Sequence, residues 1–408
     1  MTADEQPLAQ GKTKAIYKIA DNSANVRVKS FDSLTAFNAK RKNEIGGKGQ
    51  IASKTTCNVF RYLNECGIKT HFVKEIGNDE FEAKNCAMIP IEWVSRRVAT
   101  GSFLKRNPGV KEGYTFTPPL IETFFKDDAN DDPQWSEAQI LSAAFEFNGR
   151  KIGKHEYNYM ARSTSTIFRI LERAWHRQGC VLVDMKIEFG ITTDGDLVLA
   201  DVIDNDSWRL DKQFYRDLPQ VTDEALKELK KNYDRVERLT HEFLAHSTRP
   251  RAVIVMGSGA DKASAEKIAQ ALNKFGVEPV LRVSSAHKSP PETLEIIAEY
   301  ENDPTPTLFI AIAGRSNGLG PVLASNTILP VINAPPITPE WAAQDIWSSL
   351  RMPTGVGCTT VLGVDEAALA AAKNFSSTNH FVYAKLLANM LNNVEKILDS
   401  DRTINEKK

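Results

Sequence analysis

The sequence has few cysteines, and their spacing predicts neither disulfides nor a zinc site. The five cysteines among 408 residues, Cys57, Cys66, Cys86, Cys180 and Cys358, are odd in number, lie far apart and form no CxxC pair. Neither a disulfide framework nor a zinc site is therefore indicated. We interpret these cysteines as small apolar residues in a protein of a reducing compartment.

A long hydrophobic run is also missing. No stretch reaches the roughly 18 consecutive apolar residues of a membrane-spanning helix. The start of the chain, MTADEQPLAQGKTK, lacks the apolar segment of a secretory signal. We therefore expect a cytoplasmic (cytosolic) protein that is neither exported nor associated with a membrane.

Neither sign of charge is in excess. The 51 Lys and Arg residues balance the 52 Asp and Glu residues, which leaves a net charge of −1. Proteins that bind nucleic acid usually carry a basic excess, so we expect no nucleic-acid partner. A hydrophobic share of 42% and a charged share of 25% are typical of globular domains. Any recognition of phosphate must come from local clusters.

The sequence pattern changes near residue 248. Residues 222–246 carry apolar side chains at spacings of three and four, which predicts an amphipathic helix, and AVIVMGSGAD then reads as a buried parallel strand. We therefore predict two domains, 1–247 and 248–408. Alternating strands and helices in the second predict a three-layer α/β domain with a doubly wound parallel sheet. The first domain mixes alternating strands with helices, which predicts an α+β architecture large enough for two lobes.

The segment LVDMKIEFGITTDGDLVLAD is the most informative part of the first domain. Asp184, Lys186 and Glu188 alternate along a predicted strand, so their side chains share one face. The pair Asp194–Gly195 predicts a two-residue hairpin turn, which places Glu188 opposite Asp201. Two facing carboxylates without His or Cys nearby favour a bridging Mg²⁺. The alternative is a pair of solvated carboxylates on an exposed sheet face.

A basic loop lies near the start of the chain, directly before an alternating strand. Backbone N–H groups and lysine charges in such a loop can hold a triphosphate. An ordinary basic loop is the alternative, since the loop has a single glycine. Its four candidate residues are Gly11, Lys12, Thr13 and Lys14.

A second basic cluster, SRRVATGSFLKR, surrounds Gly101. It contains Arg96 and Ser102 together with further Arg and Lys residues. Guanidinium groups and a hydroxyl beside a flexible glycine are suited to binding carboxylate or phosphate. A charged surface strand is the alternative.

Four motifs, GKTKAIY, MIPIEWVSRRVATGSFLKR, LVDMKIEFG and ADVIDNDSWRL, closely resemble the SAICAR synthetase family over most of residues 8–245. The resemblance implies a kinase-like or ATP-grasp-like two-lobed fold. It also implies ATP-driven ligation of L-aspartate to the carboxylate of CAIR through an acyl phosphate. ATP contacts are implied for the GKTK loop and Met88, and Mg²⁺ ligation for Glu188 and Asp201. The remaining implied site residues are Arg96, Ser102, Asp132, Asp206 and Arg209 for CAIR, and Lys186 as a catalytic residue.

Three successive predicted strands of the second domain end in loops rich in glycine, small polar or basic residues. Since parallel strands bring their carboxyl ends to one edge, we expect these loops to meet there around a ligand. His287 is the candidate for proton transfer, because its ordinary pKa is near neutrality. A structural turn is the alternative for each loop, and a polar surface residue for the histidine. The other loop residues are Gly257, Ser258, Asp261, Ser285, Lys288, Gly314, Arg315, Ser316 and Asn317.

These loops resemble the AIR carboxylase family over about residues 252–395, and AGRSNGLG is similar to the animal class that uses CO₂ directly. The resemblance implies a flavodoxin-like fold, a homo-octamer, and no biotin, metal or ATP in this domain. His287 would move the C4 proton of AIR, and Ser316 with Asn317 would lie at the CO₂ pocket. Ala260 stands where the family usually has serine, so we expect weaker AIR binding. The implied ribotide contacts are Ser258, Asp261 and Lys288.

Together the two resemblances imply a bifunctional enzyme of purine biosynthesis, whose second domain makes the CAIR that the first consumes. Two alternatives stay open at this point: a phosphotransferase fused to a flavodoxin-like domain, and a non-catalytic ribotide-binding scaffold. The sequence has no HRD or DFG triplet and no GxGxxG, which counts against an ordinary protein kinase.

Overall fold

The structure, a computed structural model, describes residues 6–20, 22–36, 41–211, 223–244, 248–337 and 342–405. The chain forms two compact units: the first is Met1–His246 with Ala388–Lys408, and the second is Ser247–Leu387. These units differ from the predicted domains 1–247 and 248–408, because Ala388–Lys408 falls in the first unit, and the predicted boundary at residue 247 lies outside the described residues. The predicted domain division therefore stays a prediction. Within these ranges no helix is long and apolar enough to cross a membrane.

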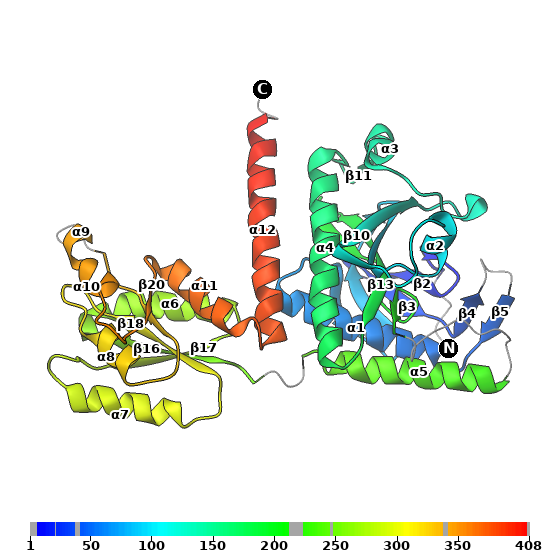
Figure 1. The fold of residues 1–408 in the computed structure, drawn as a ribbon. Coiled ribbons are helices and arrows are strands. Elements are labelled where there is room, and N and C mark those ends of the chain that lie inside the picture. The colour runs from blue at the N-terminus through cyan, green and yellow to red at the C-terminus, as the bar shows by residue number, and fades with distance from the viewer. Residues whose placement is uncertain are drawn as a thin grey trace. The chain divides into compact units, whose positions relative to one another are not determined.

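Two large antiparallel sheets form the framework of the first unit (Figure 1), and β4-β5 and β11-β12 add two small ones. The first has the order β1-β2-β3-β7-β6, with bounds β1 Ala9–Gln10, β2 Lys14–Ile19, β3 Asn22–Ser30, β6 Phe72–Glu75 and β7 Glu80–Lys84. The second has the order β10-β9-β13-β14, and β8 and β15 also pair with β13. Its strands are β8 Cys86–Met88, β9 Ile91–Val98, β10 Thr115–Phe125, β13 Leu182–Thr192, β14 Leu197–Ala200 and β15 Trp208–Leu210.

Three long helices, the part of α12 (His380–Asn405) from Ala388 on, and several short elements complete this unit. The sequence pattern predicts helices over about 155–178 and 222–246, where α4 (Lys154–Arg177) and α5 (Asp223–His241) lie, but α1 (Lys48–Cys66) was not predicted. Its first turn has no acidic residue, and Gly47 before it provides no capping side chain. Burial against α5 and the first sheet therefore stabilises this helix more than local signals do. The short elements are β4 Ser33–Ala36, β5 Arg41–Glu44, α2 Ser102–Arg106, η1 Asp128–Asn130, α3 Glu137–Ser142, β11 Glu146–Phe147 and β12 Arg150–Lys151.

The second unit has the predicted three-layer α/β architecture. Its parallel sheet has the order β17-β16-β18-β19-β20, with strands β16 Arg251–Met256, β17 Glu278–Val283, β18 Thr307–Ile312, β19 Val331–Asn333 and β20 Thr359–Thr360. Figure 1 shows α6 (Lys262–Lys274) and α11 (Val364–Phe375) on the opposite side of the sheet from α7 (Pro290–Glu301). Alternate residues of β16 explain this, because Ile254 packs on the first side and Val253 and Val255 on the second. The remaining helices are η3 Gly259–Asp261, α8 Leu319–Ser325, α9 Ala342–Asp345 and α10 Trp347–Leu350. The last helix, α12 (His380–Asn405), begins in this unit, and its residues from Ala388 on belong to the first.

The predicted register of the β13–β14 hairpin is wrong by one residue. Glu188 pairs with Ala200 and not with Asp201. The hairpin closes between Thr192 and Asp196, whose backbone hydrogen bond is 2.9 Å long, so the connecting loop has a third residue. Gly195 takes a left-handed conformation at φ 85°, as the last position of such a three-residue loop requires.

Candidate active sites

Charged residues from both sheets of the first unit meet where β14 ends. Lys14 of β2 forms an ion pair with Asp201, the residue after β14. Lys126, directly after β10, donates to both carboxylate oxygens of Glu188 at 2.9 Å. Desolvation lowers the pKa of Lys14 to about 8, and the charge of Glu188 opposes this shift. Both predicted carboxylates therefore lie close to the Lys14 ammonium group.

Asp201 reaches this position through an unusual backbone conformation. Its φ is 67°, in the left-handed region that residues other than glycine seldom adopt. In a regular strand, a residue next to the partner of Glu188 would lie on the opposite face. The left-handed conformation ends this alternation, and the Asp201 side chain contacts Lys14. The two carboxylates are thus neighbours for a reason other than the predicted cross-strand pairing.

The two carboxylates fit a divalent cation that arrives with phosphates. Both are oxygen ligands, and ammonium groups already lie against them. In the described part of the chain, no group of three or more His, Cys, Asp or Glu side chains could hold a metal ion. The other ligands would therefore come from phosphate and water, which is usual for Mg²⁺.

The predicted ATP residues surround this cluster. The GKTK loop connects β1 to β2, and the Gly11 N–H donates to the Lys14 carbonyl at 2.9 Å. The exposed Lys12 forms an ion pair of 3.0 Å with Asp128 of η1, and the Thr13 carbonyl accepts from a backbone N–H at 2.7 Å. Met88 pairs with Gly190, two residues beyond Glu188 on β13.

Two of the residues predicted to bind CAIR, Arg96 and Arg209, lie in a buried ion-pair network. Arg96, which is 5% exposed, donates to Glu122 at 2.5 Å and to Asp184 at 2.8 Å. The Arg209 Nε donates to the same Asp184 at 2.8 Å. Gly101 has φ 61°, and a Cβ there would lie 2.5 Å from an Arg209 nitrogen. Glycine is therefore required where this loop passes the guanidinium group.

Lys186 remains positively charged between several carboxylates. It donates to Glu92 at 2.5 Å. Burial alone would lower its pKa, but the charges of Glu92, Glu188 and Asp132 outweigh burial and raise it. Asp132 accepts from the Asp127 N–H at 2.7 Å. The Glu188 and Asp132 carboxylates thus both lie near the Lys186 ammonium group.

The three loops of the second unit meet at the carboxyl edge of its sheet, as the sequence predicts. The Gly257 N–H, after β16, donates to the Ile312 carbonyl of β18 at 2.9 Å. The Ser284 N–H, after β17, donates to the Met256 carbonyl at 2.9 Å. His287 lies against the loop after β18, because a Cβ on Gly318 would be 2.6 Å from its Nε2.

Comparison with known proteins matches a different family to each part of the chain. The SAICAR synthetase family model matches residues 7–242, and the AIR carboxylase family model matches residues 251–396. The chain is 54% identical over 407 residues to the probable multifunctional protein ADE2 of Caenorhabditis elegans, covering 97% of this chain and 96% of that protein. The chain belongs to the bifunctional AIR carboxylase and SAICAR synthetase family. It is therefore a bifunctional enzyme of purine biosynthesis, with a ligase and a lyase activity.

A further relative spans both family domains, and a solved structure matches the first of them. The human bifunctional phosphoribosylaminoimidazole carboxylase/phosphoribosylaminoimidazole succinocarboxamide synthetase is 52% identical over 410 residues, covering 98% of this chain and 96% of that protein. The crystal structure of phosphoribosylaminoimidazole-succinocarboxamide synthase from Ehrlichia chaffeensis has a TM-score of 0.51 and 30% identity, covering 59% of this chain and 100% of that chain. The expected two-lobed fold of the SAICAR synthetase domain is thus confirmed.

In the AIR carboxylase domain, the first two loops leave their predicted ligand groups accessible. The Ser258 hydroxyl accepts from the Ala260 N–H at 3.2 Å, so it caps a short turn. Partial burial raises the pKa of Asp261 at the end of this turn. In the second loop the Ser285 carbonyl accepts from the N–H of the exposed Lys288 at 3.1 Å.

The third loop is anchored by one of its own predicted site residues. Asn317 is 3% exposed, and its amide donates to Ser349 and accepts from the Gly320 N–H, both at 2.9 Å. Arg315 and Ser316 are exposed, and Gly314 is half-buried. Asn317 thus stabilises the loop that presents these residues, while its predicted place at the CO₂ pocket stays a prediction.

The sequence reasoning missed Lys48 in the SAICAR synthetase domain. This side chain is 2% exposed and donates to Asp206 at 3.2 Å. The Tyr233 hydroxyl donates to the same carboxylate at 2.6 Å. Burial, followed by the charge of Asp206, raises the pKa of the adjacent Asp204. The sequence does contain a signal for this residue, because Lys48 lies between glycines in GGKG. Its burial then requires a charged partner.

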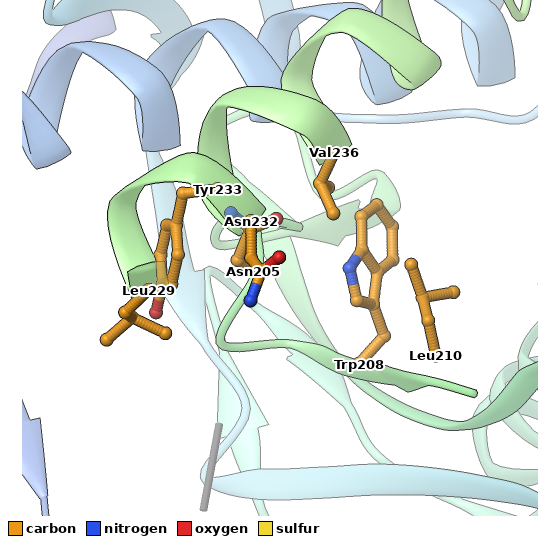
Figure 2. A pocket seen from close by; sticks show the side chains of 7 residues that line it. All are labelled: Asn205, Trp208, Leu210, Leu229, Asn232, Tyr233 and Val236. Carbon is orange, nitrogen blue, oxygen red and sulfur yellow. The ribbon is translucent and has the colours of Figure 1, made fainter. Parts of the chain in front are cut away.

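Ser102 and a small cavity complete the surroundings of this domain's site. Ser102 is exposed at the start of α2, where its hydroxyl is accessible. Figure 2 shows a cavity in which Tyr233 of α5 lies on one side, Trp208 and Val236 lie on the other, and Asn205 lies between them. Its volume of about 20 Å³ is enough for about one water molecule. The cavity therefore belongs to the packing beside Asp206 and is too small for a substrate.

Proposed function

We propose that the AIR carboxylase domain joins CO₂ to AIR to give CAIR. The SAICAR synthetase domain then ligates CAIR to L-aspartate with MgATP and releases SAICAR, ADP and phosphate. The observation that carries the proposal is the presence of two separate sites of different chemistry, one in each unit. One combines lysines and carboxylates around Glu188, and the other places His287 where three strand-end loops meet.

In ligation, the residues around Glu188 bind and neutralise ATP. Mg²⁺, when bound by Glu188 and Asp201, would offset the charge on the phosphates. Lys12 and Lys14 then contact phosphate oxygens, and Met88 packs on the adenine. The CAIR carboxylate attacks the γ-phosphorus, the bond to ADP breaks, and an acyl phosphate forms. The aspartate amine displaces phosphate from it, while Lys186 stabilises the developing negative charge.

The ribotide of CAIR is bound by the arginine network. Arg96 and Arg209 share Asp184 in the protein without substrate. A phosphate or carboxylate of CAIR accepts further N–H groups from this pair, because each guanidinium carries five donors in a fixed geometry. Ser102 adds a hydroxyl, and Asp132 and Asp206 complete the proposed contacts. The network thus positions the CAIR carboxylate near the ATP cluster.

In carboxylation, the loops of the second unit hold AIR and move one proton. A bond forms between C4 of AIR and the carbon of CO₂, and His287 takes the proton that C4 loses. Ser258, Asp261 and Lys288 bind the ribotide, with Gly257 and Ser285 in the same loops. Gly314, Arg315, Ser316 and Asn317 form the CO₂ side of the site. This half needs no biotin, metal ion or ATP.

The test is a pair of variants measured in both reactions. Glu188→Gln should abolish ligation of supplied CAIR and leave carboxylation of AIR unchanged, because only the first site loses a carboxylate. His287→Asn should abolish carboxylation and leave ligation unchanged. Glu146→Gln and His176→Asn are matched controls, since both residues are exposed and lie outside the two sites. If each test variant keeps both activities, the two-site assignment is wrong.

We further infer a cytosolic homo-octamer with the AIR carboxylase domains at its centre. The family resemblance of the sequence supports this assembly. Sedimentation of the full chain should give eight times the mass of one chain. A monomer or dimer that has full carboxylase activity would contradict the inference.

A further inference from the structure

His287 lies in a short turn whose backbone is tightly held. The Ser289 N–H donates to the Ser285 carbonyl at 2.7 Å, and the Ser289 hydroxyl accepts from the Ser285 N–H at 3.2 Å. Beneath the turn, the hydroxyl oxygens of Ser284 and Thr293 are 2.7 Å apart. The turn is therefore fixed to the start of α7, while the imidazole is exposed. Among the described residues, the imidazole has no hydrogen-bonding or ionic partner.

Gly318, in the loop after β18, is the neighbour that limits where the imidazole can lie. A Cβ built on Gly318 would be 2.6 Å from Nε2 and 2.8 Å from Cε1 of His287. Real Cβ atoms essentially never approach another heavy atom within 3.0 Å. The Nε2–Cε1 edge of His287 thus occupies the space that a side chain at position 318 would need.

The backbone at Gly318 does not itself require glycine. Its φ of −77° and ψ of −20° lie in the right-handed helical region, which every residue adopts. The loop is also held in place, because the N–H of the adjacent Asn317 donates to Ser348 and its side chain donates to Ser349, both at 2.9 Å. A side chain at position 318 would therefore displace the exposed imidazole more readily than the loop.

We propose that Gly318 is a positioning residue for His287: its missing side chain sets the place from which the imidazole takes the C4 proton. This inference rests on the proposed role of His287 in carboxylation. A Cβ at position 318 would displace the ring by about 1 Å if the contact is to become an ordinary one, and a misplacement of that size costs about 100-fold in rate.

The test is Gly318→Ala in the full-length chain. We expect the kcat of carboxylation to fall about 100-fold, while the equilibrium affinity for AIR stays within about twofold. A fall in kcat without a matching loss of AIR affinity is the readout that a purely structural effect would not give. Ligation of supplied CAIR in the same chain should be unchanged. Gly357→Ala is the matched control, since a Cβ at Gly357 meets nothing within 4 Å.

The outcomes separate this inference from the proposed function. A wild-type kcat in Gly318→Ala, beside an inactive His287→Asn, would overturn the positioning role alone. Full carboxylation by His287→Asn would overturn the role of His287 and the inference with it. An equal loss in Gly357→Ala, or a loss of AIR affinity in proportion to kcat, would show a structural effect and would also overturn the positioning role.

Discussion

The two sites of this enzyme obtain their order in opposite ways. In the SAICAR synthetase domain the lysines of the site lie in ion pairs: Lys14 pairs with Asp201, and Lys126 pairs with Glu188. In the AIR carboxylase domain the central histidine is exposed and rests against backbone. The first site is ordered by charge, and the second by the shape of its loops.

This difference follows the chemistry proposed for each site. Ligation brings together ATP, CAIR and aspartate, which all carry negative charge, so its residues must exchange internal partners for substrate groups. The internal carboxylates keep those cations in place before substrate binds. Carboxylation moves a single proton. The position of one imidazole therefore matters more for its rate than the electrostatic field of many charged residues.

The largest expected effect is the loss of a buried cation from the first site. Arg96 is only 5% exposed and forms ion pairs with Asp184 and Glu122. Arg96→Ala should therefore destabilise the first unit by about 3–5 kcal/mol, because both buried carboxylates lose this cationic partner. Hydrogen–deuterium exchange of the α4 amides measures the stability of the first unit, and exchange of the α6 amides measures the stability of the second. Exchange in α6 should not change.

The matched variant in the second site is Arg315→Ala. Arg315 is exposed, so its loss should change the stability of the second unit by no more than about 0.5 kcal/mol. Similar effects from the two arginine variants would contradict the contrast between a site ordered by charge and a site ordered by loop shape.

Regular elements with strong periodicity were predictable, and features set by tertiary contacts were not. The apolar runs of β16 and β18 and the spacing in α5 predicted the architecture of both units. The short β20 has no such pattern, and its Thr360 is held by a 2.6 Å bond to the Ser349 carbonyl. The left-handed backbone of Asp201 likewise has no sequence signal, which is why the predicted carboxylate pair came together through a different register.

A buried histidine should make the first unit more sensitive to acid. Burial lowers the pKa of His71 to about 3, and the charge of Lys14 adds to the shift. Below its ordinary pKa of about 6.5, the unfolded chain binds a proton that the folded chain does not, so stability falls with pH down to about 3. The slope from this residue is about 1.4 kcal/mol per pH unit.

His71→Phe removes this proton and keeps an aromatic ring beside Phe60 and Phe81. Exchange of the α4 amides between pH 6.5 and 4.5 should then depend less on pH than in the wild type, by about one proton, after correction for intrinsic exchange. His176→Phe is the control, because His176 is exposed. An unchanged pH slope in His71→Phe would show that the histidine is charged in the folded protein.

The smallest expected effect concerns the ribotide affinity of the second site. Ala260 is exposed in the loop after β16, and its N–H is already bonded to the Ser258 hydroxyl at 3.2 Å. Ala260→Ser adds a hydroxyl beside the proposed phosphate contacts, and one hydrogen bond of about 1 kcal/mol would tighten AIR binding about fivefold. Calorimetric titration with AIR measures the change, and Ala263→Ser, exposed in the first turn of α6, is the control. Equal affinities in Ala260→Ser and the wild type would mean that the loop binds phosphate through backbone groups alone, which would make this site independent of side-chain chemistry at position 260.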